Sequence, residues 1–294
     1  MFFQVIKRAI KDFIQLRKGQ TCDYKLLMEA HRIEKGLSHI SPKAFWGWEK
    51  AYSIAKLLKT SVNSFSNETA SAVLSAYLSE KKNNPEEKEN YYNFLNKTGF
   101  KEVYFNGIGG WKIIDHNEVS FSEKEKVTIY KLFTSRFSSR NFKEEKVPIR
   151  VIEQAIEMAS NCPSACNRQP YKVYVCDSTK IADLLGYPLQ YNCPQTLIIT
   201  GDVRAFDSYE FNDWIISPVI FAAYLSLSFH ALGVGNCIIR KDLVANSVYN
   251  TQVSQYLELS ESQRIVLEIC IGYSDDERVP LSKRKSVSDI MCVK

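Results

Sequence analysis

The stretch from Cys162 to Cys176 reads CPSACNRQPYKVYVC, and its two halves predict different structures. Small residues and two prolines predict that the first half is a fixed loop with accessible amides. In the second half, from Tyr171 to Cys176, the character of the side chains alternates from one residue to the next and β-branched side chains recur, which predicts a strand. Asn167 and Gln169 each offer donors and acceptors, and such amides suit the edge of a planar heterocycle.

The same loop contains Cys162 and Cys166, which raise the alternative of a metal or redox site. No third or fourth ligand follows at a suitable spacing, so we expect plain loop residues and no metal. All eight cysteines are spread along the chain without a CxxC. With no secretory signal evident in MFFQVIKRAIKDF, free thiols in a reducing cytoplasm are expected.

The periodicity of apolar residues along the rest of the chain predicts both helices and strands, which indicates an α+β fold. Further strands are expected at residues 196–200 and 265–273. Helices are expected at residues 2–17, 23–35, 42–59, 67–79, 123–133, 147–158 and 218–232. The charged segment 80–90 is expected to be a loop. These elements predict strands and helices together in residues 131–294, preceded by a helical extension in residues 1–130.

Composition excludes several classes of protein. With 294 residues, 45% hydrophobic and 24% charged, the chain is neither disordered nor fibrous and has room for about two domains. The apolar run from Ile215 to Leu232 contains polar residues and a proline, so a buried core helix is expected rather than a membrane span. The whole net charge of +5 lies in residues 1–130, which is too mild to imply nucleic acid.

Residues 2–17 predict an amphipathic helix with lysines and arginines largely off its apolar face. That face carries Phe2, Ile6, Ala9, Ile10, Phe13 and Leu16. Packing against the protein itself is the usual fate of such a stripe and is favoured here. Contact with a membrane surface stays open as the alternative.

A basic segment runs from Ser135 to Phe142. Arg136 and Arg140 are four residues apart with Ser138 between them, so in a helical turn they share a face that can grip a phosphate. A solvated basic helix end is the alternative.

Glycines and a late basic cluster supply weaker signals. Gly233 and Gly235, after the long apolar helix, let the backbone pass close to a flat ligand or merely end the helix. The cluster Lys283–Lys285 is either an anion contact or a solvated tail. In the N-terminal part, Gly107, Gly109 and Gly110 have the wrong spacing for a dinucleotide loop, and a plain turn is expected. His31, Glu34 and Lys35 share a helix face; a surface ion-pair cluster is favoured over a substrate site.

Taken together, these segments resemble the nitroreductase family of FMN-dependent oxidoreductases. The resemblance runs from Ser135 to about Ile290 and follows the family's motif order. It implies an α+β fold with a central mixed sheet flanked by helices. The residues that carry it are Arg136, Ser138, Arg140 and Phe142; Pro163, Ser164, Asn167, Gln169, Pro170 and Tyr171; Gly233, Gly235 and Cys237; and Gly272, Tyr273 and Arg284.

The resemblance implies a homodimer that passes electrons from NADH or NADPH through FMN to an unidentified small-molecule acceptor. Arg136, Ser138 and Arg284 would hold the phosphate, and Arg140 would lie near the pyrimidine of the flavin. The neighbouring subunit would contribute Pro163, Ser164 and Asn167. The full set of cofactor-binding residues implied is Arg136, Phe137, Ser138, Arg140, Pro163, Ser164, Asn167, Ile239, Arg240 and Arg284. No catalytic side chain is expected, because the flavin performs the chemistry.

The sequence departs from the family pattern after the glycine turn. Arg240 and Lys241 stand where many members carry glycine, at the edge where substrate would approach. This departure motivates an alternative to the oxidoreductase: a flavin-binding or scaffolding module without NAD(P)H turnover. The family-like part is also short, and residues 1–130 are a candidate for the missing cover.

Overall fold

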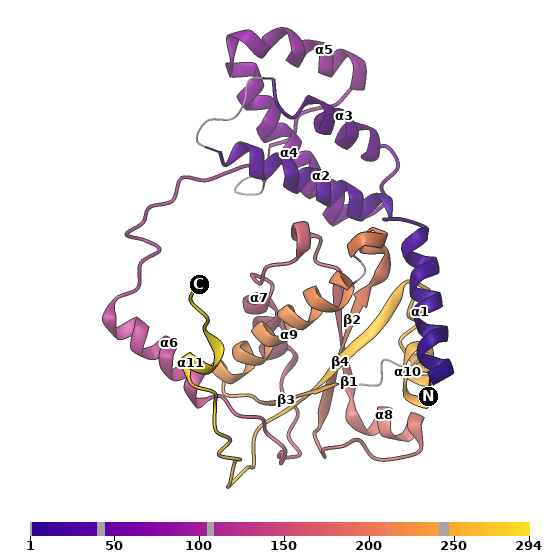
Figure 1. Cartoon of the computed structure of the whole chain (residues 1–294), viewed down its shortest axis with the longest axis vertical. Helices are drawn as coiled ribbons and strands as arrows, with labels where there is room; N and C mark the ends of the chain where they lie inside the picture. Colours follow the sequence, from indigo (N-terminus) through magenta and orange to yellow (C-terminus); the bar gives the residue numbers. More distant parts are fainter. Residues whose placement is uncertain (1, 40–44, 105–108, 211, 241–246) are drawn as a thin grey trace.

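The computed structural model describes residues 2–39, 45–104, 109–210, 212–240 and 247–294. The N-terminal part is helical, and the rest combines helices with one sheet (Figure 1). The α-helices are α1 (Phe2–Arg17), α2 (Cys22–Leu37), α3 (Trp48–Leu57), α4 (Ser64–Asn83), α5 (Lys88–Thr98), α6 (Glu123–Ser135), α7 (Ile149–Ala159), α8 (Ser178–Leu185), α9 (Asp213–Ala231), α10 (Val248–Tyr256) and α11 (Val287–Ile290). Four short 3₁₀ helices are η1 (Pro85–Glu87), η2 (Ala165–Asn167), η3 (Val203–Ala205) and η4 (Ser208–Glu210).

The described sheet has four strands in the order β1-β2-β4-β3. They are β1 (Tyr171–Asp177), β2 (Gln195–Asp202), β3 (Gly235–Arg240) and β4 (Gln263–Gly272). The predicted α+β class is confirmed, with one correction: every described pairing is antiparallel, where a mixed sheet was expected. The connections β1–β2 and β3–β4 return the chain at the end of the sheet where it left. Strands β2 and β3 are both antiparallel to β4 and so run in the same direction, and the connection that contains α9 carries the chain to the opposite end of the sheet between them.

Helices cover both faces of the sheet. In β2, the side chains of Leu197 and Ile199 enter a core shared with α7 and α9, whereas Ile198 faces α8 and α10. This alternation is the period of two that a strand imposes on its side chains. Since both faces are buried, the strand reads as a continuous apolar run.

The helices α2, α3, α4 and α5 form a second hydrophobic core. They are joined to the sheet region by the chain around η3, where Thr21 N donates to Arg204 O (3.1 Å) and Gln20 Nε2 donates to Ala205 O (3.2 Å). Leu16 of α1 is buried in the core of the sheet region. Residue 130 lies inside α6, and the division of the chain there stays a prediction.

The charged segment 80–90 corrects a sequence expectation. It was expected to be a loop, but α4 continues to Asn83 and α5 begins at Lys88. The carboxylate of Glu87 is buried, forms an ion pair with Lys81, and accepts from Trp48 Nε1 (2.6 Å). The charges that predicted exposure instead satisfy each other inside the helical core.

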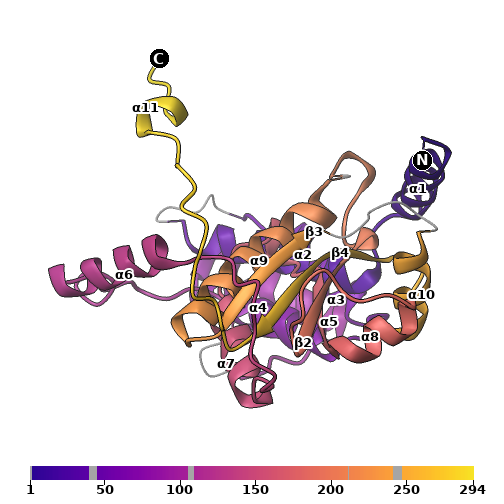
Figure 2. The ribbon, with the colours of Figure 1, turned by 90° about the horizontal axis from the view of Figure 1, so that it is seen from below.

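A long arm follows the helical core. Gly109 and Gly110 have positive φ angles of 78° and 82°, and a Cβ on Gly109 would lie 2.8 Å from Val73 N. The glycines therefore form a turn against α4, as expected; Gly107 lies outside the described residues. The arm ends in α6, which has no buried residue and projects from the body on the side opposite to α1 (Figure 2).

Helix α9 is long and apolar enough to cross a membrane by length and composition alone. In the structure, half of that apolar window is buried. Its side chains Phe221, Leu225 and Phe229 lie in the core against the sheet. The expectation of a core helix is therefore met.

Candidate functional site

The basic segment 135–142 is not a helical turn beyond Ser135 but an extended strand-like run beside β3 and β4. Ser139 N donates to Asn236 O (3.0 Å), and Phe142 pairs with Ser274 in an isolated bridge. A Cβ on Gly235 would lie 2.6 Å from Ser139 Oγ, so the glycine permits this close approach. The hydroxyl of Ser139 is buried and has no hydrogen-bond partner among the described residues.

Arg140 is exposed and held by its neighbours. Its Nε donates to Tyr191 OH (3.2 Å), its Nη1 donates to Ser138 O (3.2 Å), and its guanidinium lies over the Tyr191 ring. The hydrogen bond to Tyr191 raises the pKa of Arg140 above its ordinary value. Among the described residues, neither Arg140 nor Arg136 makes an ion pair with a carboxylate, so both charges are available to an anionic ligand.

Asp276 fixes the backbone of this segment. It accepts from the backbone N–H groups of Arg140 (3.2 Å) and Asn141 (3.2 Å), and from Ser274 Oγ (2.9 Å). Burial acts to raise the pKa of Asp276, but these hydrogen bonds outweigh it and lower the pKa. Asp276 is thus engaged by the backbone of the segment; its charge helps to raise the pKa of Arg140, but the two side chains form no ion pair in the described structure.

Arg136, Ser138 and Arg140 are alternate residues of the extended segment and so share one of its sides, while Ser139 between them bonds to the backbone of β3 next to Cys237. Burial raises the pKa of the Cys237 thiol, and all three residues oppose that shift. Ser135 Oγ lies 2.8 Å from His230 Nε2 at the end of α9, and Phe137 meets the His230 ring edge-on. The structure therefore brings the predicted residues of segment 136–140 together with the glycine turn and β3.

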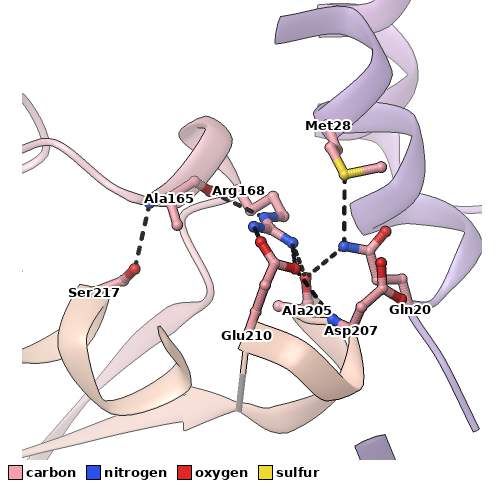
Figure 3. A network of polar contacts seen from close by, with 8 residues as sticks. All are labelled: Gln20, Met28, Ala165, Arg168, Ala205, Asp207, Glu210 and Ser217. Atoms are coloured by element: carbon pink, nitrogen blue, oxygen red, sulfur yellow. Dashed lines mark hydrogen bonds and ion pairs between the residues drawn. The ribbon is translucent and has the colours of Figure 1, made fainter. Parts of the chain in front are cut away.

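The second predicted group, Pro163, Ser164 and Asn167, lies in a loop built on a buried arginine. Arg168 is 1% exposed; it donates to Ala165 O and Ala205 O and forms a two-point ion pair with Glu210 (Figure 3). Ala165 N donates to Ser217 Oγ on α9 (3.4 Å). Ala205 O also accepts from Gln20, so the N-terminal segment and the loop share one anchor (Figure 3).

The loop has an unusual backbone. Cys166, Asn167 and Gln169 all have positive φ angles, of 51°, 51° and 46°. Residues other than glycine rarely adopt this conformation, and each costs about 1 to 3 kcal/mol. Such strain is typical of ligand-binding loops, and here the Arg168 network holds it in place.

The two groups lie at opposite ends of α9. Ser217 contacts the loop near the start of the helix, whereas His230 contacts segment 135–137 near its end. Thirteen residues of helix separate them, a rise of about 20 Å. Within one chain, therefore, the structure does not bring Asn167 to Arg136.

The other predicted residues are more scattered. Ile239 is buried in β3, and Arg240 pairs with Leu267 at the end of that strand, though only its backbone is described. Lys241 lies outside the described residues. Arg284 is exposed in the C-terminal tail that leads away from the sheet (Figure 2). Within the described chain, no contact joins it to Arg136, Ser138 or Arg140.

Several residues of the two groups were not identified from the sequence. Tyr191, Asp276 and His230 support segment 135–141, and Glu210 and Ser217 support the loop. Each lies far along the chain from its partner and belongs to no local motif. In the N-terminal part, His31 Nδ1 and Glu34 Oε2 lie 3.1 Å apart, a local contact within α2 that joins two of the three residues of the expected cluster.

The model of the nitroreductase family matches residues 133–189, which include both Arg136 and the Asn167 loop. This part of the chain is therefore similar to the nitroreductase family. The match supports the resemblance at the motifs of residues 136–142 and 163–171, whereas the motifs at Gly233–Cys237 and Gly272–Arg284 lie outside the matched residues. A comparison with curated proteins found no match.

Three solved structures of nitroreductases illustrate the similarity. An FMN-dependent nitroreductase from Clostridium difficile is 24% identical, with 55% of this chain and 94% of that one covered and a TM-score of 0.43. A nitroreductase family protein from Streptococcus pneumoniae is 23% identical, with coverages of 56% and 100% and a TM-score of 0.46. A nitroreductase with bound FMN from Desulfitobacterium hafniense is 17% identical, with coverages of 56% and 97% and a TM-score of 0.45.

Proposed function

We propose that the chain is a homodimeric FMN-dependent oxidoreductase that takes electrons from NADH or NADPH and passes them to a small-molecule acceptor. The observation that carries this proposal is the placement of Arg136, Ser138 and Arg140 on one side of the extended segment beside β3, where neither arginine forms an ion pair with a carboxylate among the described residues. Two guanidinium groups and a hydroxyl fit the phosphate of a mononucleotide. The unpartnered hydroxyl of Ser139 adds a polar group beside the same segment.

Bound FMN would supply the electron transfer, and the chain would supply binding, orientation and charge. Arg136 and Ser138 would hold the phosphate. Arg140, fixed by Tyr191, would place positive charge near the ring, where charge develops during reduction. Arg284, in the C-terminal tail, is proposed as a third residue that holds the phosphate.

Pairing of two chains is supported by the distance between the two groups. A flavin held at Arg136 needs a second chain if Asn167 is also to reach it, because α9 separates them by about 20 Å. Helix α6 exposes Val127, Tyr130 and Phe133, which recur every three residues on one side. Such an unburied apolar row is typical of a subunit interface.

The eight free cysteines support a cytoplasmic location.

The test measures FMN binding by the full-length protein, using the absorbance of the flavin and the gain in heat stability as the two readouts. Wild type is expected to bind FMN, to gain heat stability, and to lose flavin absorbance under anaerobic NADH or NADPH. Arg136→Gln should weaken FMN binding by at least about tenfold, through loss of a charge-assisted hydrogen bond. Arg150→Gln, on the exposed side of α7, is the matched control.

Two results would count against the proposal. A protein that neither binds FMN nor gains stability from it has no flavin site. A protein that binds FMN but is not reduced by either nucleotide is instead the binding module that Arg240 and Lys241 suggested.

A further inference from the structure

Helix α1 presents its apolar stripe to solvent rather than to the protein. Ile6, Ile10, Phe13 and Ile14 are 39%, 52%, 55% and 50% exposed. They are spaced i, i+4, i+7 and i+8, which places them on one side of a helix. The opposite side makes the contacts with the body: Leu16 is buried in the core, and Asp12 Oδ1 accepts from Arg264 Nε (2.8 Å).

Basic side chains border this stripe. Lys7 and Lys11 are exposed next to Ile6 and Ile10, and neither pairs with a carboxylate among the described residues. The guanidinium of Arg17 lies over the Phe13 ring at 5.8 Å. Lys18 is engaged by the exposed Glu261 (3.6 Å). Asp12, the only acid of α1, is turned toward Arg264, so the exposed side is apolar with a cationic edge.

The position of α1 leaves this side accessible. The helix lies at the periphery of the molecule, on the side away from α6 (Figures 1 and 2). A cleft of about 490 Å³ separates part of α1 from α10 and the start of β4. Its lining includes Lys11 and Ile14, so neighbouring elements do not close over them. Occupation of α1 would not compete with the pairing surface on α6.

We propose that α1 binds the surface of an anionic membrane and lies in its plane. Sixteen residues give a helix about 24 Å long, and its charged side prevents it from spanning. The apolar stripe would enter the boundary between headgroups and acyl chains, while Lys7, Lys11 and Arg17 would meet anionic headgroups. A second copy is a poorer occupant, because a symmetric contact would bring identical basic edges together. This inference is independent of flavin binding.

Sedimentation with vesicles tests it on the full-length protein. Wild type should pellet with phosphatidylcholine vesicles that contain about 30% phosphatidylserine, weakly with phosphatidylcholine alone, and less as salt rises. Ile10→Ser with Phe13→Ser, and separately Lys7→Gln with Lys11→Gln, should each lower the partition coefficient at least about tenfold. Because these side chains are exposed, the thermal midpoint should be unchanged.

Matched controls come from another exposed region. Val62→Ser with Phe65→Ser removes two exposed apolar side chains, and Lys56→Gln with Lys59→Gln removes two exposed charges. Both controls should pellet like wild type. The proposal is overturned if wild type stays in the supernatant, or if the α1 variants pellet as well as it does. It is equally overturned if, without vesicles, sedimentation velocity shows wild type self-associating through α1 and the α1 variants dispersed.

Discussion

The guanidinium of Arg168 and the carboxylate of Glu210 form a two-point ion pair with N–O distances of 2.6 and 2.9 Å. The arginine is buried, and it also donates to the carbonyl groups of Ala165 and Ala205. It stacks on Phe206, with 4.4 Å between the guanidinium carbon and the ring centroid. One side chain therefore ties the candidate flavin loop to η3 and η4, and through Ala205 to the N-terminal segment.

Glu210→Gln tests this tie. The change leaves a buried guanidinium without its counter-charge, which typically costs about 3 to 5 kcal/mol of unfolding free energy. Urea unfolding followed by circular dichroism measures the loss. Glu153→Gln, an exposed carboxylate on α7, should change stability by less than about 0.5 kcal/mol. Equal stability of the two variants would show that Arg168 finds other partners.

The positive φ angle of Cys166 predicts opposite effects for two substitutions. Cys166→Gly relieves backbone strain and should raise the unfolding free energy by about 1 kcal/mol. Cys166→Val places a β-branched residue in the left-handed region and should lower it by at least about 1 kcal/mol. Thermal denaturation ranks the two variants against wild type. A valine variant as stable as the glycine variant would mean that the loop is not held at this backbone angle.

Gly235 lies against Ser139, and an added methyl group has no room. Gly235→Ala would place a Cβ 2.6 Å from Ser139 Oγ and 3.1 Å from Gly272 O. We expect a loss of about 1 to 3 kcal/mol, typical of overpacking, measured by chemical denaturation. Adding Ser139→Gly should recover part of the loss, because it removes the nearer obstacle. Failure of the second change to recover stability would place the strain at Gly272 instead.

His230 predicts a pH dependence of stability. Burial, followed by the charge of Arg136, lowers the pKa of His230 below its ordinary value of 6.5. The unfolded chain then binds this proton more readily, so unfolding free energy falls as pH drops through about 6.5. His230→Gln should lose this part of the pH dependence between pH 7.5 and 5.5, whereas exposed His116→Gln should keep it. Identical pH profiles for both variants would contradict the assignment.

Local patterns predicted most of the elements, because periodicity and capping act over a few residues. Strand β3 was missed as a strand, since Gly235 and Asn236 resemble a turn and only Cys237–Arg240 follows. The alternation is nevertheless present: Cys237 and Ile239 are buried, and Ile238 is 42% exposed.

The residues that support the candidate site could not be predicted from local patterns for a different reason. The partners of Arg168 and Arg140 lie 42 and 51 residues away, and nothing near them indicates that they meet. Lys81 and Glu87 show the same limit in the helical core: a charged stretch predicts solvent, yet these two charges bury each other. Only the tertiary fold decides whether a charge faces water or a partner.

The length of α9 has a genetic consequence. In the proposed homodimer, with Arg136 near one end of α9 and the Asn167 loop near the other, each shared pocket would draw one half from each of two chains. A protomer disabled at Arg136 and another disabled at Asn167 would then, when mixed, rebuild one intact pocket per heterodimer while the second pocket carried both lesions. Two inactive alleles produced together in one cell would restore part of what neither supplies alone.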